Sequence, residues 1–335
     1  MSGVVLLPGD GIGVEVVGEA RKVLAAIAPG VEVGEFPIGS DSLAATGEAL
    51  PAATLAACLE AEAVMLGAVG ASDYAWSASN PEDGMFKLRK TLDVYANLRP
   101  FRDGQIDLLI VRELVGGLYY GERGTRADGT VFDVLEYRPD QVDRVLRRAF
   151  ELARTRRGRL TSVDKANVLA TSRMWRDRAT ELAAEYPDVE LDHLLVDTAA
   201  MRLVEDPARF DVIVTENTFG DILSDIAAAL AGGLGVAASA SLGDSGPGLF
   251  EPVHGTAPDI AGEGVANPTA ALRSLALLLR FGLEREDEGV RLEAVIDQVA
   301  ADVRTPDRGG SASTSEFGDA VVAALGGGVA EVADV

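Results

Sequence analysis

The chain has 335 residues, 47% of them hydrophobic, which is enough for two domains or one large α/β domain with a sizeable core. Its 53 acidic and 30 basic residues give a formal net charge of −23, and a field of this sign repels nucleic acid and anionic lipid. The sequence has no apolar run of about 18 residues and no basic-then-apolar N-terminus, so we expect a cytoplasmic protein without membrane spans. One cysteine and two histidines exclude an internal disulfide and a His/Cys zinc cluster, so any metal should be held by oxygen atoms.

The acidic residues are spread along the chain rather than gathered in a tail. Only four of the 30 basic residues are lysines, which leaves 26 arginines. Such a surplus of charge suits a surface in high salt, where screening relieves the self-repulsion. We therefore predict that the protein comes from the cytoplasm of an extreme halophile.

The N-terminal segment alternates strand and helix patterns. Strands are predicted over 4–8, 31–38 and 63–70, and helices over 14–28 and 51–62. This alternation predicts a parallel sheet with helices on its faces. The glycines of GDGIG at 9–13 lack the spacing of a dinucleotide-binding fingerprint, so the favoured interpretation is a tight turn after a central strand.

Three arginines follow in the next segment. Arg89 is expected on a helix and Arg99 just beyond it, while Arg112 follows four apolar residues on a strand predicted over 106–114. Surface arginines are usually only solvated, but a guanidinium group on a buried strand needs carboxylates as partners. Three such groups could hold a dicarboxylate through paired hydrogen bonds.

The central segment places a lysine at the end of a strand. Residues 116–138 combine aromatic residues with glycines and predict an extended hairpin, a candidate arm to a partner subunit, before an amphipathic helix over 139–157. A strand-to-helix pattern over 159–167 then puts Lys165 at a strand's C-terminal end, where α/β proteins build their sites. Lys165 is therefore a candidate base, with a snorkelling surface lysine as the alternative.

Three carboxylates lie at or after predicted strand ends. A strand over 189–197 ends in Asp197, and a strand over 210–215 leads through a short Asn/Thr/Gly turn into a helix with Asp221 and Asp225. Residues four apart share a helix face, and the apolar neighbours of this pair predict a largely buried helix. The three carboxylates could form an all-oxygen site for Mg²⁺ or Mn²⁺, although the pair on the helix could also be favoured by the helix dipole or by solvation.

The C-terminal segment predicts loops and two helices. A Gly/Ala/Ser stretch over 231–248 and a long segment over 249–268 are predicted as loops, followed by helices over about 268–282 and 288–303 and a Gly/Ala tail. Long ordered loops tend to be functional, whereas a lone histidine such as His254 is often part of the core.

Seven motifs resemble the β-decarboxylating dehydrogenase family, and in particular its isopropylmalate branch. They occur in the family's order: LPGDGIG, LRKTLDVYANLRP, VRELVGGLYYGE, SVDKANV, TENTFGDILSD, FEPVHGTAPDIAG and ANPTAA. The resemblance implies a doubly wound α/β fold with a non-Rossmann dinucleotide site. Residues 1–94 with 232–335 would form the first domain, and residues 95–231 the second, with the dimer interface and the arm.

The implied reaction is the NAD-dependent oxidative decarboxylation of 3-isopropylmalate to 2-oxoisocaproate (4-methyl-2-oxopentanoate) and CO₂ in leucine biosynthesis. The implied enzyme is a homodimer or tetramer with active sites shared between subunits. Lys165, from the second subunit, would help to deprotonate the C2 hydroxyl, and Tyr119 would protonate the enol. Asp221 and Asp225, with Asp197 of the second subunit, would bind Mg²⁺ or Mn²⁺.

The resemblance also implies binding residues for substrate and cofactor. The substrate carboxylates would be held by Arg89, Arg99 and Arg112, and its side group by Met85 and Phe86. The positions implied for NAD are Glu82, Asn167, His254, Gly255, Ala257, Asp259 and Asn267. A carboxylate at Asp259 would accept hydrogen bonds from ribose hydroxyls and repel a 2′-phosphate, which favours NAD over NADP.

Two alternatives stay open. The family's isopropylmalate enzymes usually have two leucines where this chain has Met85 and Phe86, and Lys87 is unusual, so a sister activity on homoisocitrate, isocitrate or a 3-alkylmalate is possible. The second alternative is a non-catalytic acidic metal-binding protein on the same fold. Lys165 and Tyr119 argue against it, because binding alone needs no acid and no base.

Overall fold

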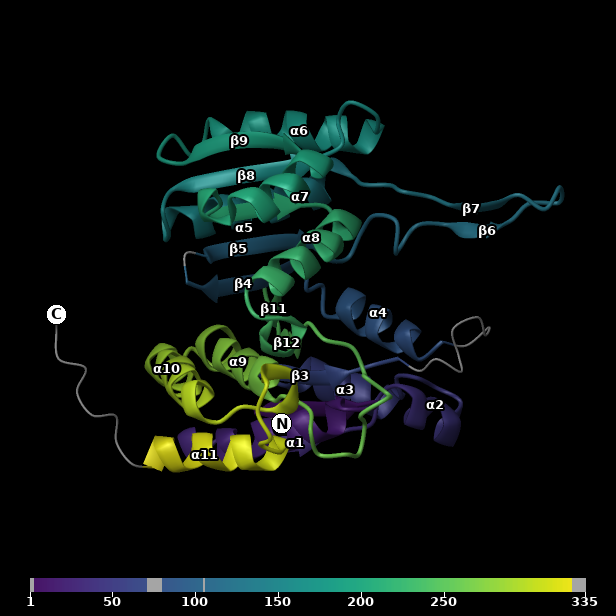
Figure 1. Cartoon of the computed structure of the whole chain (residues 1–335). Coiled ribbons are helices and arrows are strands. Elements are labelled where there is room, and N and C mark those ends of the chain that lie inside the picture. Colours follow the sequence, from purple (N-terminus) through teal and green to yellow (C-terminus); the bar gives the residue numbers. More distant parts are fainter. Residues whose placement is uncertain (1–2, 71–79, 105, 327–335) are drawn as a thin grey trace, which may run out of the picture. The chain divides into compact units, whose positions relative to one another are not determined.

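The computed structural model describes residues 3–70, 80–104 and 106–326. The chain forms two compact units, Met1–Leu92 with Leu234–Val335, and Asp93–Gly233. Each unit has its own layer of strands with helices packed on it (Figure 1). Within the described ranges, no helix is long and apolar enough to cross a membrane.

In the first unit the strands run in the order β2-β1-β3-β12-β11, all parallel to their neighbours except β11, which is antiparallel to β12. Helices α1 and α9 pack against these strands, and α10 and α11 pack on the helices. The strands are β1 (Val4–Gly9), β2 (Val33–Glu35), β3 (Ala63–Ala68), β11 (Ala238–Leu242) and β12 (Gly248–Pro252). The helices are α1 (Gly13–Ile27), α2 (Ser40–Thr46), α3 (Ala52–Glu60), α4 (Pro81–Thr91), α9 (Thr269–Leu277), α10 (Glu286–Asp302) and α11 (Thr314–Gly326).

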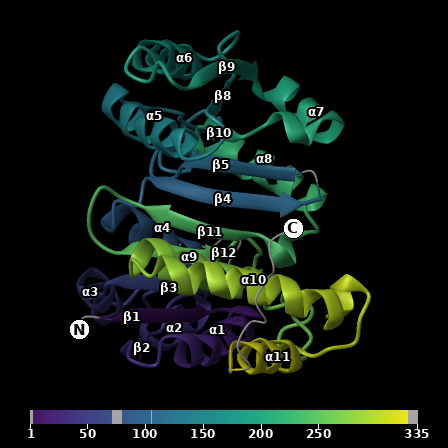
Figure 2. The same ribbon diagram turned by 90° about the vertical axis from the view of Figure 1, so that its left-hand side faces the viewer.

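In the second unit the strand order is β4-β5-β10-β8-β9, again parallel except for the antiparallel pair β4 and β5. Helices α5 and α6 lie on one face of these strands and α7 and α8 on the other, as the view in Figure 2 shows. The strands are β4 (Ala96–Asp103), β5 (Ile106–Glu113), β8 (Arg159–Asp164), β9 (Glu190–Leu195) and β10 (Val212–Thr215). The helices are α5 (Pro139–Arg154), α6 (Ala170–Ala183), α7 (Val196–Glu205) and α8 (Asn217–Leu230).

The predicted α/β fold and the predicted hairpin are both confirmed. Strands β6 (Arg123–Thr125) and β7 (Val131–Asp133) pair antiparallel and form a hairpin that projects from the second unit (Figure 1).

Several predicted boundaries are wrong. Strand β4 was not predicted: residues 96–103 form it because β5 supplies its hydrogen bonds, and Arg99, beyond helix α4 as expected, lies within this strand. Residues 231–248, predicted as a loop, contain β11, which β12 stabilises in the same way. The strand that was predicted to end in Asp197 ends at Leu195, and Asp197 lies in the first turn of α7. Helices α2 and α11 were not predicted.

Helix α8 also differs from its prediction. Residues 217–220 were predicted as a turn, but they form the first turn of the helix. The Glu216 carboxylate caps it by accepting the backbone N–H groups of Thr218 at 3.1 Å and Phe219 at 2.8 Å. In the single chain the helix is not largely buried, since Ile222 is 55% exposed and Asp225 is exposed.

Candidate active site

The site begins where β5 and β10 end side by side. Arg112, the penultimate residue of β5, is level with Thr215, the last residue of β10, and α8 starts two residues later. A side chain at Gly220 would not fit, because an added Cβ would lie 2.6 Å from Cγ of Arg112. The glycine thus lets the first turn of α8 pack directly against Arg112.

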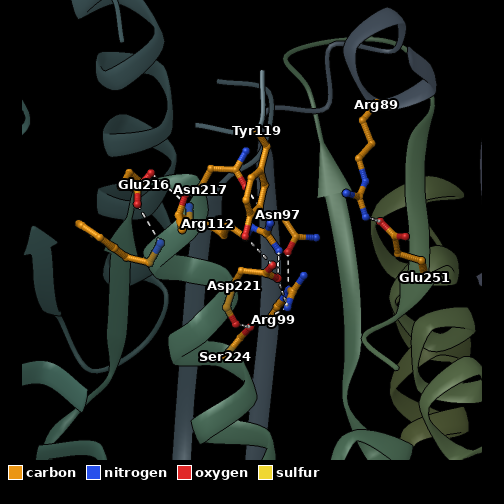
Figure 3. A network of polar contacts seen from close by, with 12 residues as sticks. Arg89, Asn97, Arg99, Arg112, Tyr119, Glu216, Asn217, Asp221, Ser224 and Glu251 are labelled. Atoms are coloured by element: carbon orange, nitrogen blue, oxygen red, sulfur yellow. Dashed lines mark hydrogen bonds and ion pairs between the residues drawn. The ribbon is translucent and has the colours of Figure 1, made fainter. Parts of the chain in front are cut away.

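The guanidinium group of Arg112 is buried between two side chains of α8 (Figure 3). Its Nε and Nη2 donate to Oδ1 of Asn217 at 3.0 and 2.7 Å, and its Nη1 donates to Oδ1 of Asp221. The prediction that a buried Arg112 needs a carboxylate partner is therefore confirmed. All three nitrogens of the planar guanidinium group thus donate hydrogen bonds, to two residues that lie one helical turn apart.

Arg99 reaches the same carboxylate from β4. Asn97 faces Arg112 across the strand pair, so Asn97 and Arg99, two residues apart, lie on the same face as Arg112. Arg99 donates through Nε to Oδ1 of Asn97 at 2.7 Å and through Nη1 to Oγ of Ser224 at 2.6 Å. Its Nη1 is 3.6 Å from Oδ1 of Asp221. Two arginines thus converge on one carboxylate.

Tyr119 completes this cluster. Its hydroxyl donates to Oδ2 of Asp221 at 3.2 Å, and the Arg112 guanidinium lies 5.8 Å from the centre of its ring. Burial, and then the negative charge of Asp221, raise the pKa of Tyr119. The phenol therefore stays protonated at neutral pH and can donate a proton.

Asp225 lies one helical turn after Asp221. Although the residue is exposed, partial desolvation of its carboxyl group and the negative charge of Asp221 raise the pKa of Asp225, so a cation beside this pair would relieve an existing repulsion. Hard oxygen ligands of this kind suit Mg²⁺ or Mn²⁺. Among the described residues of this single chain, however, no three His, Cys, Asp or Glu side chains gather as a metal site. Asp197, the third predicted ligand, is not joined to the pair within one chain.

Asp197 is instead paired with Lys165. Lys165 directly follows β8, and its Nζ donates to Oδ1 of Asp197 at 2.6 Å. This hydrogen bond lowers the pKa of Asp197. Two residues further on, Asn167 is exposed.

The loop after β12 holds five of the residues that the resemblance implies for NAD binding, His254, Gly255, Ala257, Asp259 and Asn267. Burial lowers the pKa of His254, and its buried Nε2 has no hydrogen-bond partner in the described ranges. Ala257 has a positive φ of 41°, a strained conformation for a residue other than glycine. Asn267 is held in place by the backbone N–H of Thr269 and by Asp307, each at 3.0 Å, while Gly255 and Asp259 are exposed. Nδ1 of His254 lies 2.9 Å from the carbonyl oxygen of Gly255, so Nε2 is the ring nitrogen that could bond a polar ligand beside the exposed loop groups.

The predicted residues on α4 belong to the first unit. Arg89 donates through Nη2 to Oε1 of Glu251 at 2.8 Å, and both side chains are buried (Figure 3). Met85 and Phe86 are half-buried and Glu82 is exposed. The structure thus joins Arg99, Arg112, Tyr119 and Asp221 in one cluster, Lys165 with Asp197, and Arg89 with Glu251.

Comparison with known proteins places this geometry in a family. A family model described as isocitrate/isopropylmalate dehydrogenase matches residues 3–321. The chain belongs to the isocitrate/isopropylmalate dehydrogenase family. It is therefore an oxidoreductase, a dehydrogenase of the decarboxylating type.

Two curated relatives and one solved structure give the extent of the similarity. The chain is 48% identical to the 3-isopropylmalate dehydrogenase of Anaeromyxobacter dehalogenans, over 96% of this chain and 99% of the relative. It is 49% identical to the chloroplastic 3-isopropylmalate dehydrogenase 2 of Arabidopsis thaliana, over 88% and 79% of the two chains. The crystal structure of isocitrate dehydrogenase from Methylococcus capsulatus superposes with a TM-score of 0.89 at 36% identity, covering 97% of this chain and 99% of that one.

The residues that orient the arginines of this dehydrogenase were not predicted from the sequence. Asn97 and Ser224 bond Arg99, and Asn217 bonds Arg112. A signal for Asn97 existed, since it stands two positions before Arg99, the spacing of side chains on one face of a strand. Asn217 carried no such signal, because its role depends on where α8 begins.

Proposed function

We propose that the chain is a 3-isopropylmalate dehydrogenase, which oxidises 3-isopropylmalate with NAD and releases CO₂ to form 2-oxoisocaproate in leucine biosynthesis. Full-length relatives with this name support the assignment. The observation that carries it is the convergence of Arg99, Arg112 and Tyr119 on Asp221. This cluster combines donors for carboxylates with a protonated acid, and mere binding would not need the acid.

In this proposal the arginines bind the substrate carboxylates. Arg99 and Arg112 present planar guanidinium groups from neighbouring strands, and Arg89, on α4, is proposed as the third donor. A substrate carboxylate that accepts from Arg99 and Arg112 would replace Asp221 as their partner. Met85 and Phe86, both half-buried, would contact the isopropyl group.

Proton transfers are assigned to Tyr119 and Lys165. Tyr119 keeps its proton at neutral pH and would deliver it to the enol after CO₂ leaves. Lys165 would accept the proton of the C2 hydroxyl, and for this it must be a free amine. In the single chain its Nζ is 2.6 Å from Oδ1 of Asp197, so this contact would have to open for Lys165 to reach the substrate hydroxyl.

The proposed cofactors are NAD and Mg²⁺ or Mn²⁺. Asp221 and Asp225 would bind the cation together with Asp197 of a second subunit, and the bound cation would polarise the C2 oxygen and stabilise negative charge. NAD would bind through His254, Gly255, Ala257, Asp259 and Asn267, with Glu82 and Asn167 near the nicotinamide. The exposed carboxylate of Asp259 would exclude a 2′-phosphate.

We further propose a cytoplasmic homodimer adapted to high salt. Apolar side chains on the adjacent helices α7 and α8 support the dimer, since Met201, Val204 and Ile222 are 47%, 62% and 55% exposed in the single chain. Val131 on the hairpin is 73% exposed, which suits an arm that packs on a second subunit. The net charge of −23 supports the adaptation to salt.

A comparison of substrates tests the proposed function. NADH formation is followed in about 2 M potassium chloride with Mn²⁺, using 3-isopropylmalate, homoisocitrate, isocitrate and malate. We expect kcat/KM for 3-isopropylmalate to exceed the others by about a hundredfold. Preference for a tricarboxylate would move the enzyme to a sister branch and implicate Lys87, and no turnover of any substrate would favour the non-catalytic alternative.

A further inference from the structure

A closed ring of hydrogen bonds lies directly behind Arg112. Glu113 ends β5 and is fully buried. Its carboxylate accepts the backbone N–H of Val115 at 3.1 Å, the backbone N–H of Gly116 at 2.9 Å and the hydroxyl of Tyr137 at 3.0 Å. No lysine or arginine among the described residues lies within ion-pair distance of this carboxylate. These three donors therefore satisfy its buried oxygen atoms, which makes their placement exacting.

The ring continues through Asn217. The Tyr137 hydroxyl accepts the backbone N–H of Asn217 at 3.1 Å, and the Asn217 side chain donates through Nδ2 to the carbonyl of Gly116 at 2.9 Å. Glu113, Gly116, Asn217 and Tyr137 thus hold one another. The same Asn217 uses its Oδ1 to accept two N–H groups of Arg112. The amide is thereby oriented from both ends, with its nitrogen toward the ring and its oxygen toward the arginine.

Two glycines make room for Tyr137 in this ring. A Cβ added at Gly116 would lie 2.7 Å from Cε1 of Tyr137, and one added at Gly117 would lie 2.5 Å from its hydroxyl oxygen. Gly117 also has a φ of +73°, which residues with a side chain rarely adopt. Gly116 and Gly117 therefore allow the backbone after β5 to turn in close contact with Tyr137.

The ring also sets the start of α8. The first N–H groups of a helix have no partner within the helix, and here Tyr137 accepts that of Asn217, while Glu216 accepts those of Thr218 and Phe219. Asp221 lies one turn later on the same helix. The ring thus positions both the amide that holds Arg112 and the helix that carries Asp221.

We propose that Glu113 and Tyr137 are positioning residues for the substrate-binding Arg112, acting through Asn217. The proposal rests on the proposed function, because it assigns Arg112 to the substrate carboxylate. Neither residue is proposed to contact the substrate. Their loss should therefore weaken substrate binding while leaving unaffected the NAD contacts that we propose on the loop after β12, which belongs to the first unit.

Tyr137→Phe is the most direct test, because it removes one hydroxyl group and keeps the aromatic side chain that packs edge-on to Trp175, with the two ring centres 6.1 Å apart. We expect KM for 3-isopropylmalate to rise about tenfold, the effect of one lost hydrogen bond in a buried network. KM for NAD should stay within about twofold. Tyr186→Phe is the matched control: Tyr186 is a buried tyrosine of the same unit, stacked on Phe150 and away from the ring. Its two KM values should match those of the wild type.

A double-mutant cycle with Asn217→Ala tests the route of the effect. Asn217→Ala removes the amide that holds Arg112 but keeps the backbone N–H that Tyr137 accepts, so adding Tyr137→Phe to Asn217→Ala should raise KM for 3-isopropylmalate much less than Tyr137→Phe does alone. Glu113→Gln gives a second perturbation of the ring, since its amide nitrogen cannot accept the donors that the carboxylate accepts. It should raise the same KM.

The outcomes distinguish a failure of the positioning role from a failure of the proposed function. A Tyr137→Phe protein with a lower melting temperature but both KM values unchanged would show that the ring is merely structural and would overturn the inference. Full additivity in the cycle would also overturn it, because the effect would then not pass through Asn217. If the wild type fails to oxidise 3-isopropylmalate, the proposed function itself is wrong, and this inference falls with it.

Discussion

Replacing Arg112 with lysine tests the geometry of the site without changing its charge. Arg112 makes two hydrogen bonds to Asn217 and one to Asp221, and a single ammonium nitrogen cannot reach all of these partners. Loss of two charged hydrogen bonds, at about 1.5 kcal/mol each, amounts to about 3 kcal/mol. We expect kcat/KM for 3-isopropylmalate to fall on the order of a hundredfold.

The assay is initial-rate NADH formation with saturating NAD in high salt. Arg102→Lys is the matched control, because Arg102 lies on β4, the strand paired with β5, and also faces an aspartate, but its side chain is 67% exposed and 3.4 Å from Asp107. Such an exposed pair contributes little, so this variant should retain wild-type kinetics. If Arg112→Lys kept kcat/KM within about threefold of wild type, the fork of Arg112 would not be the substrate contact that we infer.

Three further predictions concern stability and catalysis. Burial raises the pKa of Glu113 from 4.5 to about 7, so this group favours the folded state at low pH, and about 3 kcal/mol of stability should be lost as pH rises from below 4.5 to above 7. Urea unfolding of Glu113→Gln should show a correspondingly flatter pH profile, and an unchanged profile would refute this. The net charge of −23 predicts a higher unfolding midpoint in about 2 M potassium chloride than in dilute buffer, and equal midpoints would contradict adaptation to salt. Lys165→Ala should lower kcat by a factor of about 1,000 without unfolding the protein, and undiminished turnover would exclude Lys165 as the base.

Local sequence patterns predicted most of the elements that carry the site. The apolar run before Arg112 predicted its strand, and the spacing of Asp221 and Asp225 predicted a shared helix face. These predictions succeed because strand and helix periodicity depend on residues a few positions apart. The motifs also predicted the family, which the comparisons confirm.

Boundaries failed where distant residues decide the structure. Strand β11, made of small residues, and strand β4, interrupted by Pro100, form because strands elsewhere in the chain supply their hydrogen bonds. The exposure of Ile222 has a related cause. Its apolar character predicted burial, but a single chain offers it no covering surface.

By itself the sequence determined the α/β class, the family and the residue types of the site, because these depend on short-range periodicity and on motifs. Only the tertiary structure decided which side chains meet. The register of β4 on β5 places Asn97 opposite Arg112, and the first turn of α8 brings Asn217 between Arg112 and Tyr137. Residues 97, 112, 137 and 217 are far apart in the chain, so no local pattern encodes their contact. Strand pairing and burial together bring them within hydrogen-bond distance.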